Sequence, residues 1–479
     1  MDTKKLRQKI LDLAIRGKLV PQDPNDEPAS VLLERIRAEK EQLIKEGKIK
    51  RSKKSVASDT SHYENVPFEV PEGWCWGNLL NVCHIFGRIG FRGYTKEDLI
   101  AYDGAITLSP SNIIDGKMDY NTCTYISWNK YDESPEIQIQ DNDILLVKTG
   151  SSYGKCALVE KLPKQATINP QFVVLKHISC NPEYLTYVLQ SKYAQYNYEK
   201  FVLGTAIPTF TQVALGNMQI PIPPLSEQNR IVTEIKRLLA IIESLENNQR
   251  HLKEVLALSK SKILEIALSG KLIPQDSNDE PAIELLTKIN PAYKSCDNRH
   301  YENIPFELPE TWLWVTLSDI SNYGECANVS VDKISNESWV LELEDIEKDS
   351  GRLLQRMRKS DRTINGVRHS FQKGDVLYSK LRTYLNKVLV ADQDGYCTTE
   401  IIPITCVQGI VPEYLCHVLR SKYYVDYTIS LGYGVKMPRL GTGDALKSMI
   451  PVPPYEEQRR IVKSVNEIYH KLEQISSEL

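Results

Sequence analysis

Residues 62–76 read HYENVPFEVPEGWCW, and residues 300–314 read HYENIPFELPETWLW, 238 positions later in the chain. Two more pairs of stretches repeat in the same order, with shifts of 253 and 230 positions: GKLVPQD at 17–23 with GKLIPQD at 270–276, and PIPPLSEQNRIV at 221–232 with PVPPYEEQRRIV at 451–462. Several separated stretches that recur in the same order indicate that one structural unit is present twice. The repeats therefore predict two copies of one unit.

The residues between the repeated stretches differ widely between the two copies. Residues 99–121 of the first copy have no recognisable counterpart in residues 332–358 of the second. This pattern is expected if the repeated frame sets the geometry and each insert recognises something different.

A coiled-coil pattern follows Pro224. Apolar residues recur in steps of four and three, with exceptions at Gln249 and Ser259. The pattern predicts one helix from Ser226 to Leu268, whose 43 residues would span about 65 Å. The seam consists of Ile231, Ile235, Leu238, Ile242, Leu245, Leu252, Leu256, Ile263 and Ile266.

The second copy of this helix is divided between the two ends of the chain. It begins at Glu456 and stops at Leu479, before the seam is complete. The missing part lies at the N-terminus, where Leu6, Ile10 and Leu13 continue the same seam. We therefore expect a circularly permuted repeat, with the termini side by side and the terminal helices antiparallel to the central helix.

Composition is that of a soluble globular protein. Of the 479 residues, 41% are hydrophobic and 25% are charged, unlike a disordered or collagen-like chain. No apolar run approaches the roughly 18 to 20 residues of a membrane helix, and the sequence does not start with an apolar signal core, so we expect a cytoplasmic protein. The net charge of −3 neither indicates nor excludes nucleic-acid binding, because binding depends on where the charges lie.

These patterns predict an α+β protein with two mixed α/β domains joined by long antiparallel helices, and with an internal pseudo-two-fold repeat. The expected regions, in chain order, are a helical region at 1–59, a first domain at 60–224, a central helical region at 225–299, a second domain at 300–454 and a C-terminal helix at 455–479.

The repeated stretches resemble one known family. GKLVPQDPNDEPA at 17–29, PEGWCW at 71–76 and PIPPLSEQNRIV at 221–232, duplicated around variable inserts, resemble the specificity subunits of type I restriction-modification systems over nearly the whole chain. The resemblance implies two target recognition domains at the ends of two antiparallel helices, each reading one half of a split double-stranded DNA sequence. It also implies a subunit that is not catalytic, around which two modification (methyltransferase) and two restriction (endonuclease) subunits assemble.

The same resemblance assigns all cofactors to other chains. It implies that S-adenosylmethionine binds the modification subunits and that ATP and Mg²⁺ belong to the restriction subunits, whereas this chain holds none. Two recognition domains that helices hold about 50 to 65 Å apart can bind half-sites that lie one to two turns of DNA apart. Because the inserts differ, the target is expected to be asymmetric.

Each copy contains a buried-strand pattern followed by a polar, basic loop. Residues 143–147 (DILLV) precede the first loop, and residues 375–378 (DVLY) precede the second. Both resemble a recurrent element of the family's recognition domains, and we expect them at a sheet edge, where hydroxyls and amides hold phosphates while Arg or Asn reaches bases. An ordinary exposed loop is the alternative. The candidate DNA-binding residues are Lys148, Thr149, Ser151, Ser152, Tyr153, Lys155, Lys380, Arg382, Tyr384, Asn386 and Lys387.

Three other segments carry candidates. Residues 204–210 and 434–440 resemble a late loop of the family's recognition domains, although a purely structural turn is an equal alternative for the first. Residues 87–94 combine glycines, arginines and aromatics in what we expect to be a flexible loop. The candidates are Thr205, Thr209, Lys436 and Arg439 in the late loops, and Arg88, Arg92 and Tyr94 in the glycine-containing loop.

Residues 355–390 are strongly basic. They hold nine Lys or Arg residues against two Asp residues, a balance of +7, which indicates a surface that faces a duplex. Arg356 and Arg358 are the candidates added here. Acidic residues within 342–347 are interpreted as offsetting this charge elsewhere in the protein.

Four tryptophans accompany the repeated frames, namely Trp74, Trp76, Trp312 and Trp314. They could stack on bases, but their position at the entrance of each predicted domain favours a packing role.

Motifs for catalysis are incomplete. Residues 452–455 (VPPY) lack the polar first residue that an amino-methyltransferase needs, and residues 150–156 (GSSYGKC) are one residue short of a P-loop. The ten cysteines have no zinc-site spacing. We therefore expect no catalysis by this chain. The alternative function is a helical scaffold that spaces partner subunits without reading DNA; loss of DNA binding with assembly intact, on charge reversal at Lys380 and Arg382, would exclude it.

Overall fold

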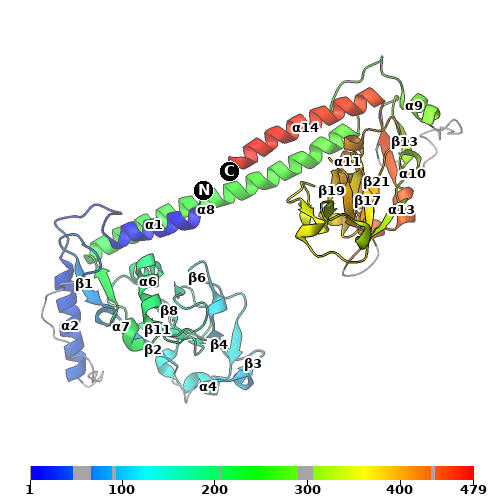
Figure 1. Ribbon diagram of the computed structural model, residues 1–479. Coiled ribbons are helices and arrows are strands. Elements are labelled where there is room, and N and C mark those ends of the chain that lie inside the picture. Colours follow the sequence, from blue (N-terminus) through cyan, green and yellow to red (C-terminus); the bar gives the residue numbers. More distant parts are fainter. Residues whose placement is uncertain are drawn as a thin grey trace. The chain divides into compact units, whose positions relative to one another are not determined.

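The computed structural model describes residues 2–46, 66–88, 93–204, 207–289, 306–432 and 437–478 (Figure 1). The chain forms two compact units, residues 1–248 and 249–479. Each unit combines helices with β-sheets, so the predicted α+β class is confirmed. The five predicted regions subdivide these units and stay a prediction. Within the described ranges, no helix combines the length and the apolar character needed to cross a membrane.

The first unit contains an antiparallel helix pair. Helix α1 (Thr3–Ile15) lies along helix α8 (Leu225–Leu268), whose residues up to Asn248 belong to this unit. Arg7 of α1 pairs with Glu246, and Gln22, beyond the end of α1, donates a hydrogen bond to Glu227 near the start of α8. The two helices therefore run in opposite directions, as predicted, and α8 starts one residue before the predicted start. Helix α2 (Ala29–Lys45) follows α1.

Two four-stranded sheets, of order β10-β4-β7-β3 and β2-β11-β8-β9, form the mixed domain of the first unit. Strands β1 and β12 pair with each other, as do β5 and β6. The strands are β1 (Cys75–Asn78), β2 (His84–Gly87), β3 (Leu99–Ile100), β4 (Ala105–Leu108), β5 (Ile113–Ile114), β6 (Lys117–Met118), β7 (Thr124–Ile126), β8 (Ile144–Val147), β9 (Cys156–Leu158), β10 (Ala166–Ile168), β11 (Phe172–Lys176) and β12 (Gln219–Ile222). The helices are α3 (Leu79–Val82), α4 (Trp128–Asp132), α5 (Pro182–Gln190), α6 (Lys192–Phe201) and α7 (Gln212–Gly216).

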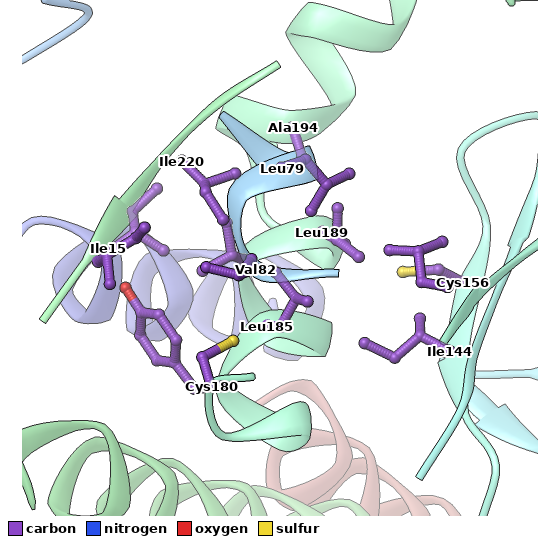
Figure 2. Close-up of a cluster of buried hydrophobic side chains, with 14 of the residues drawn as sticks. Ile15, Leu79, Val82, Ile144, Cys156, Cys180, Leu185, Leu189, Ala194 and Ile220 are labelled. Carbon is purple, nitrogen blue, oxygen red and sulfur yellow. The ribbon is translucent and has the colours of Figure 1, made fainter. Parts of the chain in front are cut away.

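Strand β8 is apolar throughout because both of its faces are buried. Ile144 and Leu146 point into a core that also contains residues of α1, α5 and α6, whereas Leu145 and Val147 point into a second core between the two sheets. Successive strand residues face opposite sides, so an uninterrupted apolar run is what such a strand requires. Figure 2 shows Ile144 and Cys156 of the sheet facing the side chains of α5.

The second unit repeats this plan. Helix α14 (Tyr455–Ser477) lies antiparallel to the part of α8 that starts at Gln249: Lys260 pairs with Glu473, and Gln275 donates to Glu457. The predicted adjacency of the two termini concerns the placement of the units and stays a prediction. The sheets have the orders β14-β17-β20-β15-β16, β19-β18-β21 and β13-β22.

The elements of the second unit have the following bounds. The strands are β13 (Leu313–Thr316), β14 (Asn328–Ser330), β15 (Trp339–Leu341), β16 (Met357–Arg358), β17 (Val367–Phe371), β18 (Val376–Ser379), β19 (Val388–Val390), β20 (Gly395–Thr398), β21 (Ile401–Ile404) and β22 (Met449–Val452). The helices are α9 (Ala282–Ile289), α10 (Leu317–Ile320), α11 (Pro412–Arg420), α12 (Lys422–Leu431) and α13 (Thr442–Leu446).

The divergent inserts have a common topology, which corrects the expectation that they have no counterparts. Strand β4 pairs parallel to β10, and β15 pairs parallel to β20 in the same way. A one-turn 3₁₀ helix follows in both: the Asn112 side chain accepts from the Ser109 amide, and the Asp345 side chain accepts from the Glu342 amide. The pair Ser109 and Asn112 and the pair Glu342 and Asp345 thus form the same backbone geometry with different residue types. Sequence comparison missed the equivalence for this reason.

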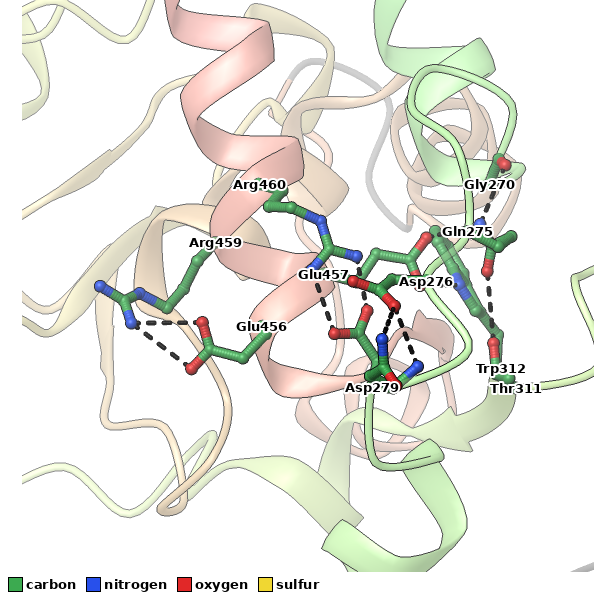
Figure 3. Close-up of polar contacts among 11 residues, drawn as sticks. Gly270, Gln275, Asp276, Asp279, Thr311, Trp312, Glu456, Glu457, Arg459 and Arg460 are labelled. Atoms are coloured by element: carbon green, nitrogen blue, oxygen red, sulfur yellow. Dashed lines mark hydrogen bonds and ion pairs between the residues drawn. The ribbon is translucent and has the colours of Figure 1, made fainter.

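The repeated stretches meet at one joint in each unit. In the second unit, Trp312 Nε1 and Gln275 Nε2 both donate to the carboxylate of Glu457, and Arg460 pairs with Asp279 (Figure 3). The first unit has the same contacts: Trp74 and Gln22 donate to Glu227, while Arg230 pairs with Asp26. The repeated residues therefore connect the start of α8 or α14 to the loop that follows its antiparallel partner helix and to the tryptophan before β1 or β13.

The tryptophans pack, as predicted. Trp74, Trp76, Trp312 and Trp314 are all buried. Trp76 makes edge-to-face contacts with Phe68 and Tyr193, and Trp314 makes the same contacts with Phe306 and Tyr423. None of these rings is available for a base.

A buried histidine in the second copy makes the stability of that copy depend on pH. His417 of α11 is buried, and burial together with the nearby Arg420 lowers its pKa to about 4. The first copy carries Tyr187 at this position. A histidine whose pKa is lower in the folded state destabilises the protein as pH falls below its unfolded value of about 6.5.

We therefore expect the second unit to lose roughly 2 kcal/mol of unfolding free energy between pH 7 and pH 5 because of this histidine. The stability is fully present above about pH 6.5 and decreases toward pH 4. Urea unfolding of the full chain at both pH values measures it, and His417→Tyr should remove this part of the loss. An unchanged pH dependence in that variant would contradict the assignment.

Candidate nucleic-acid interface

The two predicted loops of the first unit lie against each other. The loop 148–155 connects β8 to β9, and Thr149 forms an antiparallel bridge with Thr209 of the late loop. Their hydroxyl oxygens are 2.8 Å apart. The Gly150 amide donates to Pro208 O at 3.0 Å, and the Phe210 amide donates to Lys148 O at 3.1 Å. Residues 60 positions apart in sequence thus form one surface.

The second unit pairs its loops in the same way. The loop 380–387 connects β18 to β19, and Leu381 forms an antiparallel bridge with Arg439. The Arg382 amide donates to Pro438 O at 2.7 Å, and the Leu440 amide donates to Lys380 O at 2.9 Å. Each hydrogen bond has its counterpart in the first unit, 232 positions earlier for the first loop and 230 for the second. We call each assembly a loop pair.

The loop pairs lie at the ends of central strands. Strand β8 is flanked by β11 and β9, and β18 is flanked by β21 and β19. Each loop connects an interior strand to the edge strand beside it, β8 to β9 and β18 to β19, so the loops lie where an edge strand begins. A hairpin end still leaves the loop backbone unpaired by the sheet, because the ladder of hydrogen bonds stops there.

Lys148 and Lys380 occupy the same position of the two loop pairs. Both are half-buried, and within the described residues neither side chain has an ion pair or a hydrogen bond. Burial lowers the pKa of Lys148, since no carboxylate offsets the loss of hydration. An external anion would restore this balance, and a phosphate group suits a lysine at the end of a strand.

The remaining candidates of the first loop vary in exposure. Ser151 and Lys155 are exposed, whereas Ser152 and Tyr153 are half-buried. Thr205 of the late loop lies outside the described residues.

The second loop offers longer side chains. Tyr384 is exposed, and Asn386 donates from its amide to Arg420 O at 2.9 Å. Lys387 donates to Leu343 O at 2.6 Å, so its ammonium group is used within the unit. Lys436 lies outside the described residues.

Glu400 is a residue that the sequence did not single out. It lies between β20 and β21; its carboxylate accepts from Arg439 at 2.9 Å, and its carbonyl accepts from the Lys380 amide at 3.0 Å. The guanidinium of Arg439 lowers the pKa of Glu400. Glu400 thus connects both loops and holds Arg439 in one orientation. Nothing local to Glu400 could have indicated this, because its partners are 20 and 39 positions away.

The glycine-containing loop contributes less than expected. Arg88 is buried and donates to Ile168 O and to the Thr167 hydroxyl, both at 3.1 Å. Tyr94 lies under its guanidinium, 5.0 Å away, and shares a hydrogen bond with Thr107. Both residues are therefore fixed to strands β4 and β10, not carried on a flexible loop. Arg92 lies outside the described residues.

Four of the nine basic residues in 355–390 form ion pairs within the second unit. Arg356 pairs with Asp392 at 2.6 Å, and Arg358 pairs with Glu337 at 2.5 Å. The other pairs are Arg362 with Asp345 and Arg368 with Glu342. The interpretation that the acidic run offsets charge elsewhere is wrong, because two of its carboxylates bind these arginines directly. Arg356 and Arg358 remain at the surface, and their partners are 67% and 72% exposed.

No cluster of three or more metal-ligating side chains occurs in the part of the chain that the structure describes. The polar groups of the loop pairs are instead cations, hydroxyls and backbone amides. Such a set can hold an extended anion and form hydrogen bonds with flat polar edges.

Residues 115–254 match the family described as type I restriction modification DNA specificity domain. The specificity subunit of the type I restriction enzyme EcoAI from Escherichia coli is 27% identical to this chain over 541 residues, which cover 97% of this chain and 88% of that protein. The chain is thus similar, over nearly its whole length, to specificity subunits of type I restriction enzymes.

Other specificity subunits show the same relationship. That of EcoEI from Escherichia coli is 26% identical, over 99% of this chain and 90% of that protein. The HsdS subunit of Thermoanaerobacter tengcongensis has a similar fold, with a TM-score of 0.50 at 18% identity over 86% of this chain and 93% of that one. A chain from a structural study of complex assembly in a type I R-M system has a TM-score of 0.54 at 19% identity, over 86% and 94% of the two chains. The fold of the specificity subunits thus extends over most of this chain.

Proposed function

We propose that this chain is the DNA-recognition subunit of a type I restriction-modification complex and reads a bipartite, asymmetric DNA target. One observation carries the proposal: each unit presents a loop pair with the same backbone hydrogen bonds and different side chains. Equal backbones would place both loop pairs equivalently on DNA. Different side chains would present different donors to the base edges, so the two half-sites would differ.

The chemistry of the loop pairs supports a division of roles. Lys148 and Lys380, equivalent in position, would bind phosphates and set the register of each unit on the duplex. Thr149 and Thr209 offer hydroxyl groups where the second unit offers Leu381 and Arg439. Specific readout would therefore come from the residues that differ, and general affinity from those that are shared.

The relatives named above support the proposed partners. We propose that the chain acts in the cytoplasm, catalyses nothing itself, and assembles with two modification subunits and two restriction subunits. S-adenosylmethionine would bind the modification subunits, and ATP and Mg²⁺ the restriction subunits. Turnover by the purified chain alone would contradict this assignment.

The test maps methylated adenines by single-molecule sequencing in cells with the gene intact and with the gene deleted. We expect a split, asymmetric motif that disappears on deletion and returns when the gene is restored. A methylation pattern that is the same with and without the gene, together with no DNA binding by the purified complex, would contradict the proposal. Assembly of that complex without sequence preference would instead support a scaffold.

A further inference from the structure

The loops 148–155 and 380–387 share two features of their backbones. The first contains positive backbone φ angles at Gly150 (101°) and Gly154 (82°), and the second contains them at Arg382 (52°) and Asn386 (49°), in the same two places. The turn within each loop is also the same: the Tyr153 amide donates to Gly150 O, and the Leu385 amide donates to Arg382 O. The second unit therefore uses an arginine where the first uses a glycine.

Arginine is an unfavourable choice for this backbone. The left-handed region is higher in energy for a residue with a Cβ atom than for glycine. Asparagine, as at position 386, is the usual substitute for glycine there. Residues held in this region cluster at functional sites, where the surrounding structure imposes the strain. Since the first loop shows that glycine serves the same turn, the turn itself does not explain Arg382.

Among the described residues, the side chain of Arg382 has no hydrogen-bond or ion-pair partner. Its Nε–H donor is buried and has no hydrogen-bond acceptor, and the guanidinium makes no ion pair among the described residues. Arg356, Arg358 and Arg439 nearby in sequence or space are all paired with carboxylates. An unmet donor lowers stability unless a ligand satisfies it.

The location limits what that ligand is. Arg382 follows Lys380 by two residues, and its backbone is bonded to the late loop, so its side chain belongs to the loop pair. A guanidinium is a planar fork of donors that matches two acceptors in one plane. In double-stranded DNA the O6 and N7 atoms of guanine form such a pair in the major groove, and arginine is their commonest partner.

We propose that Arg382 is a specificity-determining residue that reads a guanine in the half-site bound by the second unit, whereas Gly150 leaves the equivalent position of the other half-site unread. The inference rests on the proposed function and adds the base to it. A contact to phosphate uses the same guanidinium, but it weakens binding to all sequences equally and leaves the motif unchanged.

The experiment compares Arg382→Gly and Arg382→Lys with the unchanged chain in the assembled complex. Methylated-adenine mapping gives the motif, and binding to a panel of duplexes with each base at each motif position gives the discrimination. Arg382→Gly copies the first loop, so its melting temperature is expected to equal or exceed that of the unchanged chain. That measurement separates a lost contact from a lost fold.

We expect Arg382→Gly to accept any base at one guanine of one half-site, with a loss of about 5- to 150-fold in discrimination there and no change in the other half-site. Arg382→Lys should lose part of the discrimination, because an ammonium group cannot form the planar fork. An unchanged motif, with or without a uniform loss of affinity, would overturn the inference and leave the proposed function intact. If the unchanged chain directs no motif, the proposed function fails and the inference fails with it.

Discussion

Replacing Lys380 by glutamate is expected to reduce the affinity of the assembled complex for its target duplex by at least about tenfold, and Lys148→Glu is expected to do the same. Both lysines follow a central strand at the same position of the two loop pairs, and neither side chain has an ion pair or a hydrogen bond among the described residues. Each would lose a phosphate contact and place a carboxylate against the DNA backbone. The loss should therefore be the same for all sequences.

Salt dependence identifies the lost contact. The slope of log affinity against log salt should decrease in magnitude by about one for each substituted lysine, since one fewer counterion is released. The double variant Lys148→Glu/Lys380→Glu should abolish methylation in cells while still assembling with the modification subunit. Binding is measured by titration of a fluorescent duplex at several salt concentrations.

A matched control is available in the first unit. Lys161 is exposed at the other end of strand β9 from the loop pair, so Lys161→Glu changes the net charge equally but away from the proposed contact. It should leave the affinity within about twofold of the unchanged chain at moderate salt, where distant surface charges are screened. Equal losses in Lys161→Glu and Lys148→Glu would contradict a local phosphate contact.

The substitution Lys176→Met is expected to lower the free energy of unfolding of the first unit by about 3 to 5 kcal/mol. Lys176 Nζ lies 2.6 Å from Asp143 Oδ2, and the two side chains are only 9% and 8% exposed. Without the ammonium group, Asp143 would keep a buried charge that no cation offsets. Urea unfolding of the full chain at pH 7 measures the loss.

The double variant Asp143→Leu/Lys176→Met tests the cause. Removing both charges also removes the buried-charge penalty, so at least half of the lost stability should return. Recovery would be incomplete, because Asp143 also accepts from the Gln140 amide. If Lys176→Met costs less than about 1 kcal/mol, or if the double variant is less stable than the single one, the buried-pair explanation is wrong.

The second unit shows a natural alternative to this pair. At the equivalent position, Asp375 accepts from the hydroxyl of Thr405 at 2.8 Å, without a lysine. Both units have an aspartate here because its carboxylate also accepts a hydrogen bond from a turn amide, that of Gln140 in the first unit and that of Gln372 in the second. The turn therefore requires the aspartate, and either a lysine or a threonine can donate a further hydrogen bond to its carboxylate.

The sequence by itself determined the features that depend on local patterns. The seam after Pro224 predicted helix α8, and the repeated stretches predicted two equivalent units, each with an antiparallel helix pair. The strand-and-loop pattern located the first loop of each loop pair, and the family resemblance located the late loop. These features follow from sequence because a hydrophobic period and a repeated stretch are visible without knowing which distant residues meet.

Only the tertiary structure decided which charges remain for a ligand. The sequence predicted that Arg362 and Arg368 belong to one basic surface. The fold instead pairs Arg362 with Asp345 and Arg368 with Glu342. It likewise fixes Arg88 to strand β10 and leaves Arg382 in a left-handed conformation, with no side-chain partner among the described residues. The physical reason is that an ion pair, or a residue held in the left-handed conformation, depends on contacts between segments far apart in the chain. A local sequence pattern does not specify those contacts.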